Sequence, residues 1–440
     1  MHKAIIPLLY VLIFSVSNLF AGNGSKPHYN DKDINHIVSQ LTLEQKARLL
    51  VGCPGSDKGV SHIVAGSAGY TFPIDSLGIP SINLADGPVG VRITPVLPNK
   101  PYTSYCTCFP STTALAATWN KDIARLEGNA IGDEALAYGV DIVLTPGINI
   151  MRNPLCGRNF EYFSEDPYLS GIMGAAMING IQDKGIGASL KHFIANNQQT
   201  GKLYNDARIS QRAIREIYLK GFEICIKNSD PWTVMGSYNK IGGQYTQANP
   251  ELLRTILRNE WNYNGLIVTD WYKKRDTADQ LNGGTDLMMP GEQSQVDEII
   301  AGVKNGRISE TTLNKSVKYV LKLISKSISN KGWEYNEAPD LAANAALARR
   351  IATEGMVLLK NDRSFLPISQ GAKIALFGAT AYKSIAGGTG SSNVNKAHIT
   401  DISTGLEKSS ASKHGPEDPS SQQRHFWSHR ILGRKVLSCQ

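Results

Sequence analysis

Short apolar runs alternate with longer amphipathic stretches between residues 81 and 325, and each run ends in a polar or glycine-containing cluster. The apolar runs are Ser81–Leu84, Asp141–Leu144, Ile186–Leu190, Trp232–Met235, Leu266–Val268 and Asp286–Met289. Apolar residues at helical spacing mark the stretches Asp122–Ala137, Ser210–Lys227 and Ser309–Ser325. A repeated strand-then-helix order is typical of a parallel α/β sheet. Because no break in composition interrupts the pattern, it favours a closed TIM-type (β/α)8 barrel over residues 31–325 rather than an open sheet.

Two helices are expected before the first of these strands. Apolar residues recur at helical spacing in Asp33–Val51, and Thr42-Leu-Glu-Gln45 has the form of a capping box. The side chains of a capping box bind the free N–H groups at the start of a helix. The second helix is therefore expected to begin at Thr42.

A polar linker, residues 326–341, ends the barrel pattern, and a new α/β unit follows it. The pattern predicts a helix over Leu341–Leu359, a turn over Lys360–Pro367 and a strand over Lys373–Phe377. Apolar periodicity then ends, and residues 409–440 form an atypical polar tail that is expected to reflect truncation or a disrupted reading frame. We therefore expect this second domain to be incomplete.

The N-terminus resembles a cleavable signal peptide over residues 1–21. It has a short basic start, an apolar run over Ala4–Phe20 and a small residue at Ala21. An uncleaved membrane anchor is the alternative, because a run of this length is near the lower limit for a membrane span. No other stretch of the sequence approaches that length, so the mature protein is expected to be exported, to the periplasm or outside the cell, and to be free of the membrane.

The charge distribution argues against a nucleic-acid partner. The formal net charge is +8, but residues 413–440 contribute +3 and Lys3 contributes +1. The remaining +4 is spread along the rest of the chain and is too dilute for a nucleic-acid-binding surface. With 41% hydrophobic and 19% charged residues, the chain can bury a core.

Polar and aromatic residues just after the predicted strands are the candidates for an active site, because the loops that follow barrel strands build it. The candidates are Asp86, Arg158, Lys191, His192, Tyr238, Asp270 and Trp271. Carboxylates, cations and aromatic rings together suit a sugar. The apolar face of a sugar ring stacks on tryptophan, and its hydroxyl groups form hydrogen bonds with charged side chains.

Other kinds of chemistry find no support in these motifs. The candidates include no histidine pair at metal-ligand spacing, and the six cysteines show no C-x-x-C spacing. The sequence has no G-x-S-x-G elbow, and the glycine loop Gly387–Ser392 lacks the lysine of a phosphate-binding loop and resembles only a tight turn. We therefore expect neither a metal nor a cofactor.

Five sequence motifs surround the candidate residues. They are LADGPVGVR (Leu84–Arg92), GRNFEYFSEDP (Gly157–Pro167), KHFIANN (Lys191–Asn197), MGSYN (Met235–Asn239) and GLIVTDW (Gly265–Trp271). In order and spacing they resemble the β-glucosidase branch of glycoside hydrolase family 3. The resemblance implies a barrel followed by an α/β sandwich domain, of which residues 342–408 would be the beginning. It also implies a retaining mechanism in which Asp270 is the catalytic nucleophile and forms a covalent glycosyl-enzyme, Tyr238 orients it, and Trp271 is the platform of the sugar.

The resemblance assigns roles to the other candidates too. Asp86 matches the carboxylate that holds distal sugar hydroxyls, and Arg158, Lys191 and His192 match donors around the same ring. A β-glucoside is therefore the expected partner. Within the family, β-xylosidase and N-acetylglucosaminidase activities are the alternatives, but Gln198–Asp206 lacks the histidine that the second activity would need.

The general acid/base of the family is a glutamate from the later part of the second domain. Glu407 and Glu417 are the late glutamates of this sequence, and neither lies in a matching context. Three functional hypotheses follow. The protein is an exported exo-β-glucosidase, a catalytically impaired sugar-binding remnant, or an enzyme that transfers the glycosyl group to an acceptor other than water.

Overall fold

The computed structural model describes most of the chain as two units. The described residues are Tyr29, 34–55, 64–94, 103–271, 275–369 and 372–411. The first unit runs to Met356 and also includes Thr389–Lys396, and the second comprises Val357–Gly388 with the residues from Ala397 onward. The predicted signal peptide and residues 412–440 of the predicted tail lie outside the described residues.

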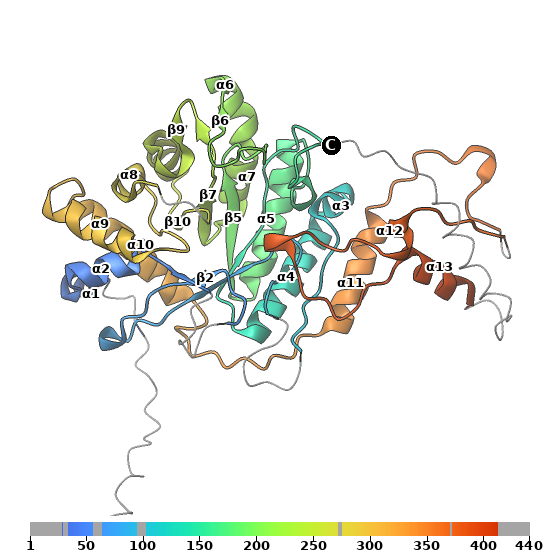
Figure 1. Ribbon diagram of the computed structural model, residues 1–440, viewed down its shortest axis with the longest axis horizontal. Helices are drawn as coiled ribbons and strands as arrows, with labels where there is room; N and C mark the ends of the chain where they lie inside the picture. Colours follow the sequence, from blue (N-terminus) through green and yellow to red (C-terminus); the bar gives the residue numbers. More distant parts are fainter. Residues whose placement is uncertain are drawn as a thin grey trace, which may run out of the picture. The chain divides into compact units, whose positions relative to one another are not determined.

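Seven strands of the first unit form one sheet in the order β1-β2-β3-β4-β5-β7-β10 (Figure 1). They are β1 (Cys53–Pro54), β2 (Gly69–Tyr70), β3 (Asn83–Asp86), β4 (Ile142–Leu144), β5 (Gly187–Phe193), β7 (Thr233–Gly236) and β10 (Leu266–Val268). The last five correspond to the first five predicted apolar runs and pair in parallel. Strands buried on both faces are apolar along their whole length, which explains why the sequence pattern located them.

The sixth predicted run closes this sheet into a barrel. Val268 pairs in parallel with Leu287, and Val51 pairs in parallel with Met288. The N–H of Gly52 donates a hydrogen bond to the carbonyl of Met288 (2.8 Å). Backbone pairing therefore continues from β10 back to the start of β1, and the α/β barrel expected from the sequence is confirmed.

One strand runs against the expected all-parallel order. β2 is antiparallel to both β1 and β3. A parallel neighbour needs a crossover connection, usually through a helix. The segment from β2 to β3 contains only a single 3-10 turn, Asp75–Leu77, so the chain turns back without crossing the sheet. Two-residue strands such as β1 and β2 carry too little pattern for sequence analysis to detect.

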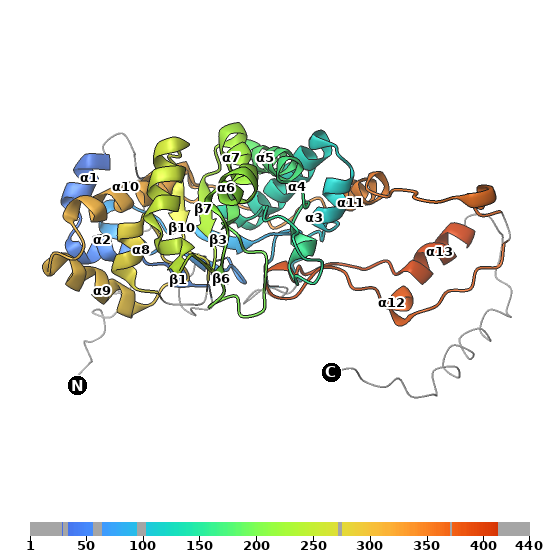
Figure 2. The ribbon, with the colours of Figure 1, turned by 90° about the horizontal axis from the view of Figure 1, so that it is seen from above.

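Helices surround the barrel on two sides. They are α1 (Ile34–Gln40), α2 (Leu43–Leu49), α3 (Thr112–Ala117), α4 (Lys121–Tyr138), α5 (Pro167–Asp183), α6 (Gln211–Ala213), α7 (Lys220–Ser229), α8 (Thr277–Gly283), α9 (Gln293–Lys304), α10 (Glu310–Lys326) and α11 (Leu341–Glu354). In Figures 1 and 2, α1, α2, α9 and α10 gather on one side and α4, α5 and α7 on the other. None of the helices in the described ranges combines the length and the apolar character that crossing a membrane requires.

The predicted helices agree with the structure to different degrees. α2 has the expected capping box: the N–H of Gln45 donates to Oγ1 of Thr42 (3.2 Å), and the N–H of Thr42 donates to Oε1 of Gln45 (2.9 Å). α4 and α10 also match their predictions. The predicted helix Ser210–Lys227 is interrupted by a π-helical turn, Ile214–Tyr218, between α6 and α7. A second π-helix, Glu251–Glu260, follows a small sheet of β6 (Asp206–Ala207), β8 (Lys240–Ile241) and β9 (Gln244–Tyr245).

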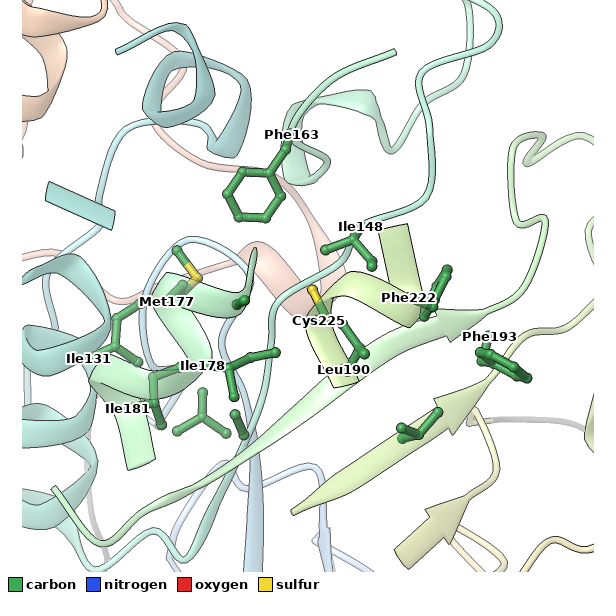
Figure 3. Packing of buried hydrophobic residues seen from close by; sticks show 14 of the residues in the cluster. Ile131, Ile148, Phe163, Met177, Ile178, Ile181, Leu190, Phe193, Phe222 and Cys225 are labelled. Atoms are coloured by element: carbon green, nitrogen blue, oxygen red, sulfur yellow. The ribbon is translucent and has the colours of Figure 1, made fainter. Parts of the chain in front are cut away.

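The barrel helices pack closely because glycines remove side chains at their contacts. A Cβ on Gly180 of α5 would lie 2.1 Å from the carbonyl oxygen of Arg125 in α4, and one on Gly128 would lie 2.3 Å from that of Met177. Figure 3 shows the apolar cluster that fills the space between α4, α5, α7 and β5. Its labelled members include Ile131, Met177, Ile178, Ile181, Leu190, Phe193, Phe222 and Cys225. This dense packing holds the strand ends in fixed positions.

The second unit differs from the sequence prediction. Its described residues contain the helices α12 (Ala379–Tyr382) and α13 (Ile402–Ala411) but no strand. The predicted strand Lys373–Phe377 is not formed, and the side chains of Ile374 and Phe377 are 52% and 84% exposed. A strand needs a hydrogen-bonded neighbour, and no described segment of this unit pairs with it. The helix predicted to reach Leu359 ends at Glu354.

One buried carboxyl group of α4 leads to a stability prediction. Glu127 is buried, and its Oε2 has no hydrogen-bond partner among the described residues. Burial raises the pKa of Glu127 from 4.5 to about 8. The folded state therefore binds the carboxyl proton of Glu127 more tightly than the unfolded state does. As a result, the free energy of unfolding decreases as the pH rises from about 4.5 to about 8.

Glu127→Gln should remove this pH dependence. Between pH 5 and pH 8, we expect the free energy of unfolding of the wild type to fall by roughly 3 kcal/mol more than that of the variant. Urea denaturation at the two pH values measures it. Glu44→Gln is the matched control, because Glu44 is exposed on the short helix α2. Equal shifts for both variants would contradict the assignment to Glu127.

Candidate active site

A pocket of about 350 Å³ lies where the barrel strands end. All seven candidate residues line it: Asp86, Arg158, Lys191, His192, Tyr238, Asp270 and Trp271. β3 ends at Asp86, Lys191 and His192 lie near the end of β5, and Tyr238 and Asp270 follow β7 and β10. Parallel barrel strands present their carboxyl ends at the same face, so residues far apart in sequence meet here.

Asp270 is buried, and only one of its carboxylate oxygens has a hydrogen-bond partner among the described residues. The N–H of Trp271 donates to Oδ1 (2.7 Å). Oδ2 has no hydrogen-bond partner among the described residues and lies 3.8 Å from Nε2 of His192. Burial raises the pKa of Asp270, while Arg158, the N–H of Trp271 and Lys191 act against the rise. Asp270 is thus a buried carboxylate with positively charged side chains near it.

Two cations lie beside this carboxylate. Lys191 is buried, which lowers its pKa, whereas the negative charges of Glu161, Asp86 and Asp270 favour its charged form. Arg158 and Glu161 form an ion pair with two contacts, of which Nη2 to Oε2 is 3.1 Å. Burial alone would lower the pKa of Arg158, but Glu161, Tyr162 and Asp270 together outweigh burial and raise it. Arg158 is therefore a permanent positive charge in the pocket wall.

His192 is neutral and held in place from behind. The backbone N–H of His192 donates to Oδ1 of Asn149 (3.0 Å), and Nδ2 of Asn149 donates to the backbone carbonyl of His192 (2.9 Å). Nδ1 lies 3.2 Å from the hydroxyl of Tyr162, which accepts a hydrogen bond from Nδ2 of Asn196 (3.0 Å). Burial, reinforced by neighbouring cations, lowers the pKa of His192 well below its usual value. A neutral imidazole therefore turns Nε2 toward Asp270.

Arg92 belongs to the site although sequence analysis did not select it. Nη1 of Arg92 lies 3.2 Å from Oδ2 of Asp86, and the backbone N–H of Arg92 donates to the carbonyl of Asp86 (2.8 Å). The signal was present, because Arg92 is the last residue of the motif that also contains Asp86. The pair orients the Asp86 carboxylate at the pocket.

Lys202 is a further cation that sequence analysis missed. It lines the pocket, and its Nζ lies 4.6 Å from the centre of the Tyr238 ring. Burial lowers the pKa of Lys202. The side chain of Tyr238 in turn lowers the pKa of Asp270. Nε1 of Trp271 donates to the carbonyl of Ala68 (3.0 Å), which fixes the indole ring.

The glycine loop near residue 390 also reaches the pocket. Thr389, Gly390 and Ser391 line it, and Gly390–Ser392 form one turn of 3-10 helix. Sequence analysis interpreted this loop as a tight turn, which agrees with the 3-10 turn, but assigned it no place at the pocket. Its position could not be predicted, because the contacts of the loop are to barrel residues far away in sequence.

Comparison with protein families identifies the chain. The model "Glycosyl hydrolase family 3 N terminal domain" matches residues 101–323, just over half of the 440 residues. The chain belongs to glycosyl hydrolase family 3. The model "Glycosyl hydrolase family 3 C-terminal domain" matches residues 356–426 of this family 3 chain. The resemblance that the five motifs carried is thereby confirmed.

Individual relatives agree with this family. Thermostable beta-glucosidase B of Acetivibrio thermocellus is 42% identical over 87% of this chain and 49% of its own length. An exo-alpha-(1->6)-L-arabinopyranosidase of Bifidobacterium longum is 38% identical over 82% of this chain and 48% of its own. The family 3 chain thus spans about half the length of these curated relatives.

A solved structure gives the same result for the fold. Beta-glucosidase 3B of Thermotoga neapolitana, in complex with alpha-D-glucose, is 42% identical and superimposes with a TM-score of 0.85. The match covers 91% of the family 3 chain and 57% of that protein.

In the described part of the chain, no three His, Cys, Asp or Glu side chains gather in a way that could hold a metal ion.

Proposed function

We propose that the pocket recognises a β-glucosyl group and that Asp270 attacks its anomeric carbon. The observation that carries the proposal is that Oδ2 of buried Asp270 has no hydrogen-bond partner among the described residues, while Arg158 and Lys191 supply positive charge to the same pocket. The positive charges stabilise an ionised carboxylate before attack. The names of several relatives, β-glucosidases among them, support glucose as the sugar.

The proposed reaction has two displacement steps. In the first, Oδ2 of Asp270 bonds to the anomeric carbon while the bond to the leaving oxygen breaks, and that oxygen takes up a proton. In the second, a water oxygen displaces the carboxylate and loses a proton, which releases the sugar with its original configuration. Neutral His192, Lys191 and Asp86 are placed to form hydrogen bonds with sugar hydroxyls through both steps.

A glucoside with fluorine at carbon 2 and an activated leaving group tests the mechanism. Fluorine slows the second step more than the first, so the covalent intermediate accumulates. We expect mass spectrometry of a protease digest to find the added fluoroglucosyl group on the peptide that contains Asp270. An adduct on another side chain, or a digest without any adduct after long incubation, would overturn the proposed role of Asp270.

A second sugar is a candidate because one relative is named an exo-alpha-(1->6)-L-arabinopyranosidase. L-Arabinopyranose lacks the hydroxymethyl group of glucose and has the opposite orientation at the 4-hydroxyl, so contacts around these two positions decide between the sugars. Isothermal titration of the chain with glucose and with L-arabinose compares them directly. Tighter binding of L-arabinose would replace glucose in the proposal while leaving the role of Asp270 unchanged.

We also propose that the protein is exported, as the pattern of residues 1–21 suggests. Sequencing the N-terminus of the protein recovered from its native cell checks this. A mature chain that begins close to residue 22 supports export. A chain that retains Met1 and stays in the cytoplasm refutes it.

A further inference from the structure

We propose that Val394 and Asn395 anchor the segment Thr389–Lys396 to the barrel, and that this anchorage positions Thr389–Ser391 as a wall of the sugar pocket. The segment is called the strap below. The inference rests on the proposed function, because it treats the pocket as a sugar site. The chain leaves the first unit after Met356 and returns to it only through the strap. The strap therefore brings a segment that is distant in sequence from the barrel strands to the active site.

The anchor end of the strap is held by two hydrogen bonds to one barrel loop. The N–H of Cys106 donates to the carbonyl of Asn395 (2.9 Å), and Nδ2 of Asn395 donates to the carbonyl of Ser104 (2.5 Å). Both the backbone and the side chain of Asn395 are therefore hydrogen-bonded to the backbone of residues 104–106. Among the described residues, no other side chain of the strap forms a hydrogen bond to the barrel.

Val394 adds an apolar contact beside these hydrogen bonds. Its side chain is 1% exposed. Gly90 lies directly under it: a Cβ on Gly90 would be 3.5 Å from Cγ2 of Val394 and 2.0 Å from the carbonyl oxygen of Thr107. A side chain at Gly90, which has a φ of +128°, would clash with the carbonyl of Thr107, whereas its Cβ would be at ordinary contact distance from Val394. The same loop begins at Asp86, so it supports both the strap and a sugar-facing carboxylate.

The connection from the anchor to the pocket wall is short and compact. Ser392 is fully buried, and the N–H of Val394 donates to its carbonyl (3.0 Å). The N–H of Asn393 donates to the carbonyl of Gly390 (3.1 Å). Gly390 and Ser391 thus lie one 3-10 turn from the anchor. If the contacts of Asn395 are lost and the strap leaves the barrel, this wall of the pocket is removed. The apparent ligand affinity is then proportional to the fraction of molecules in which the strap is docked.

Asn395→Asp tests the anchor with nearly unchanged side-chain volume. The substitution removes the donor to the carbonyl of Ser104 and places negative charge against that oxygen. We expect the dissociation constant for glucose, measured by titration calorimetry, to rise about tenfold. KM for a nitrophenyl β-glucoside should rise by a similar factor with kcat little changed. Amide hydrogen exchange should speed up at residues 392–394 but not in the barrel strands.

Asn393→Asp is the matched control, because it makes the same change on an exposed side chain of the same strap. It should leave glucose affinity and amide exchange at their wild-type values. Val394→Ala is the second variant, and it should weaken glucose binding without adding charge. It keeps the inference open to refutation if Asn395→Asp fails to fold.

The outcomes separate this inference from the function on which it rests. Wild-type binding of glucose that Asn395→Asp and Val394→Ala both leave unchanged would overturn the inference alone. Faster exchange in the strap without any loss of affinity would do the same, because the strap would then not be a wall of the sugar site. A wild-type chain that binds no glucose would overturn the proposed function, and this inference with it.

Discussion

Asp270→Asn is expected to lower the rate of nitrophenyl β-glucoside cleavage by roughly 10⁴-fold or more. The amide keeps the shape of the side chain and can still accept the N–H of Trp271, which donates to Oδ1 of Asp270 (2.7 Å). It is too weak a nucleophile to displace the leaving group from the anomeric carbon. Sugar binding should persist, because Asp86, Lys191 and His192 stay in place. Initial rates and glucose titration on the same preparation measure the two effects separately.

Two comparison variants give this result its meaning. Asp86→Ala should mainly weaken glucose binding, because it removes hydrogen bonds that are made throughout the reaction. Asp297→Asn makes the same carboxylate-to-amide change on the exposed face of α9 and should leave the rate unchanged. If Asp270→Asn retained more than a small fraction of the wild-type rate, a different group would have to be the nucleophile.

The position of the pocket could be predicted because of how a barrel is built. Asp86, Lys191, Tyr238 and Asp270 each follow an apolar run, and closing the sheet brings the ends of those runs to one face. Sequence therefore located them through local pattern alone. The roles given to these residues stay predictions, since shared pocket lining does not show which of them reacts.

Contacts that depend on approach between distant segments were not predictable. The strap is held to the barrel by hydrogen bonds between Asn395 and the backbone of Ser104 and Cys106, and no local pattern marks contacts between segments so far apart in sequence. Lys202 was missed for a similar reason: its contact is with the ring of Tyr238, a residue on another loop. The reversed strand β2 escaped because two residues carry no periodicity.

The second unit shows what happens when local propensity lacks a partner. Ile374 and Phe377 have the apolar spacing of a strand, yet both are exposed and the segment is unpaired. Strand formation depends on a neighbouring strand, whereas helices such as α11 satisfy their own backbone groups. The prediction of the helix now seen as α11, which lies in the first unit, was accordingly closer to the structure than the prediction of a strand.

The carboxylates of the pocket lead to a prediction about leaving groups. Besides Asp270, the described residues that line it include two carboxylates, Asp86 and Glu161. Asp86 lies 3.2 Å from Nη1 of Arg92, and Glu161 is paired with Arg158. A carboxyl group in an ion pair with arginine is poorly placed to give a proton to a leaving oxygen. Neither of these two carboxylates of the described pocket lining is therefore well placed to act as a general acid.

We expect the 440-residue chain to cleave a dinitrophenyl β-glucoside readily and to hydrolyse cellobiose roughly 10²–10⁴-fold more slowly than a general acid would allow. A dinitrophenolate departs without a proton, whereas the sugar alcohol released from cellobiose needs one. The general acid would also act as base in the second step, so without it release of the phenolate should show a burst as the intermediate on Asp270 accumulates. Stopped-flow absorbance with intact-protein mass spectrometry measures both.

Azide provides the decisive control, because it attacks the glycosyl-enzyme without needing a base. Added azide should speed steady-state turnover and yield β-glucosyl azide, in which the configuration of the substrate is retained after two displacements. Chloride at the same concentration is the matched salt control and should have little effect. Similar rates on cellobiose and on the aryl glucoside, with no burst and no effect of azide, would show that a general acid and base is present. Glu417 would then be the first residue to replace, and a partner chain that completes the site would be the second explanation to test.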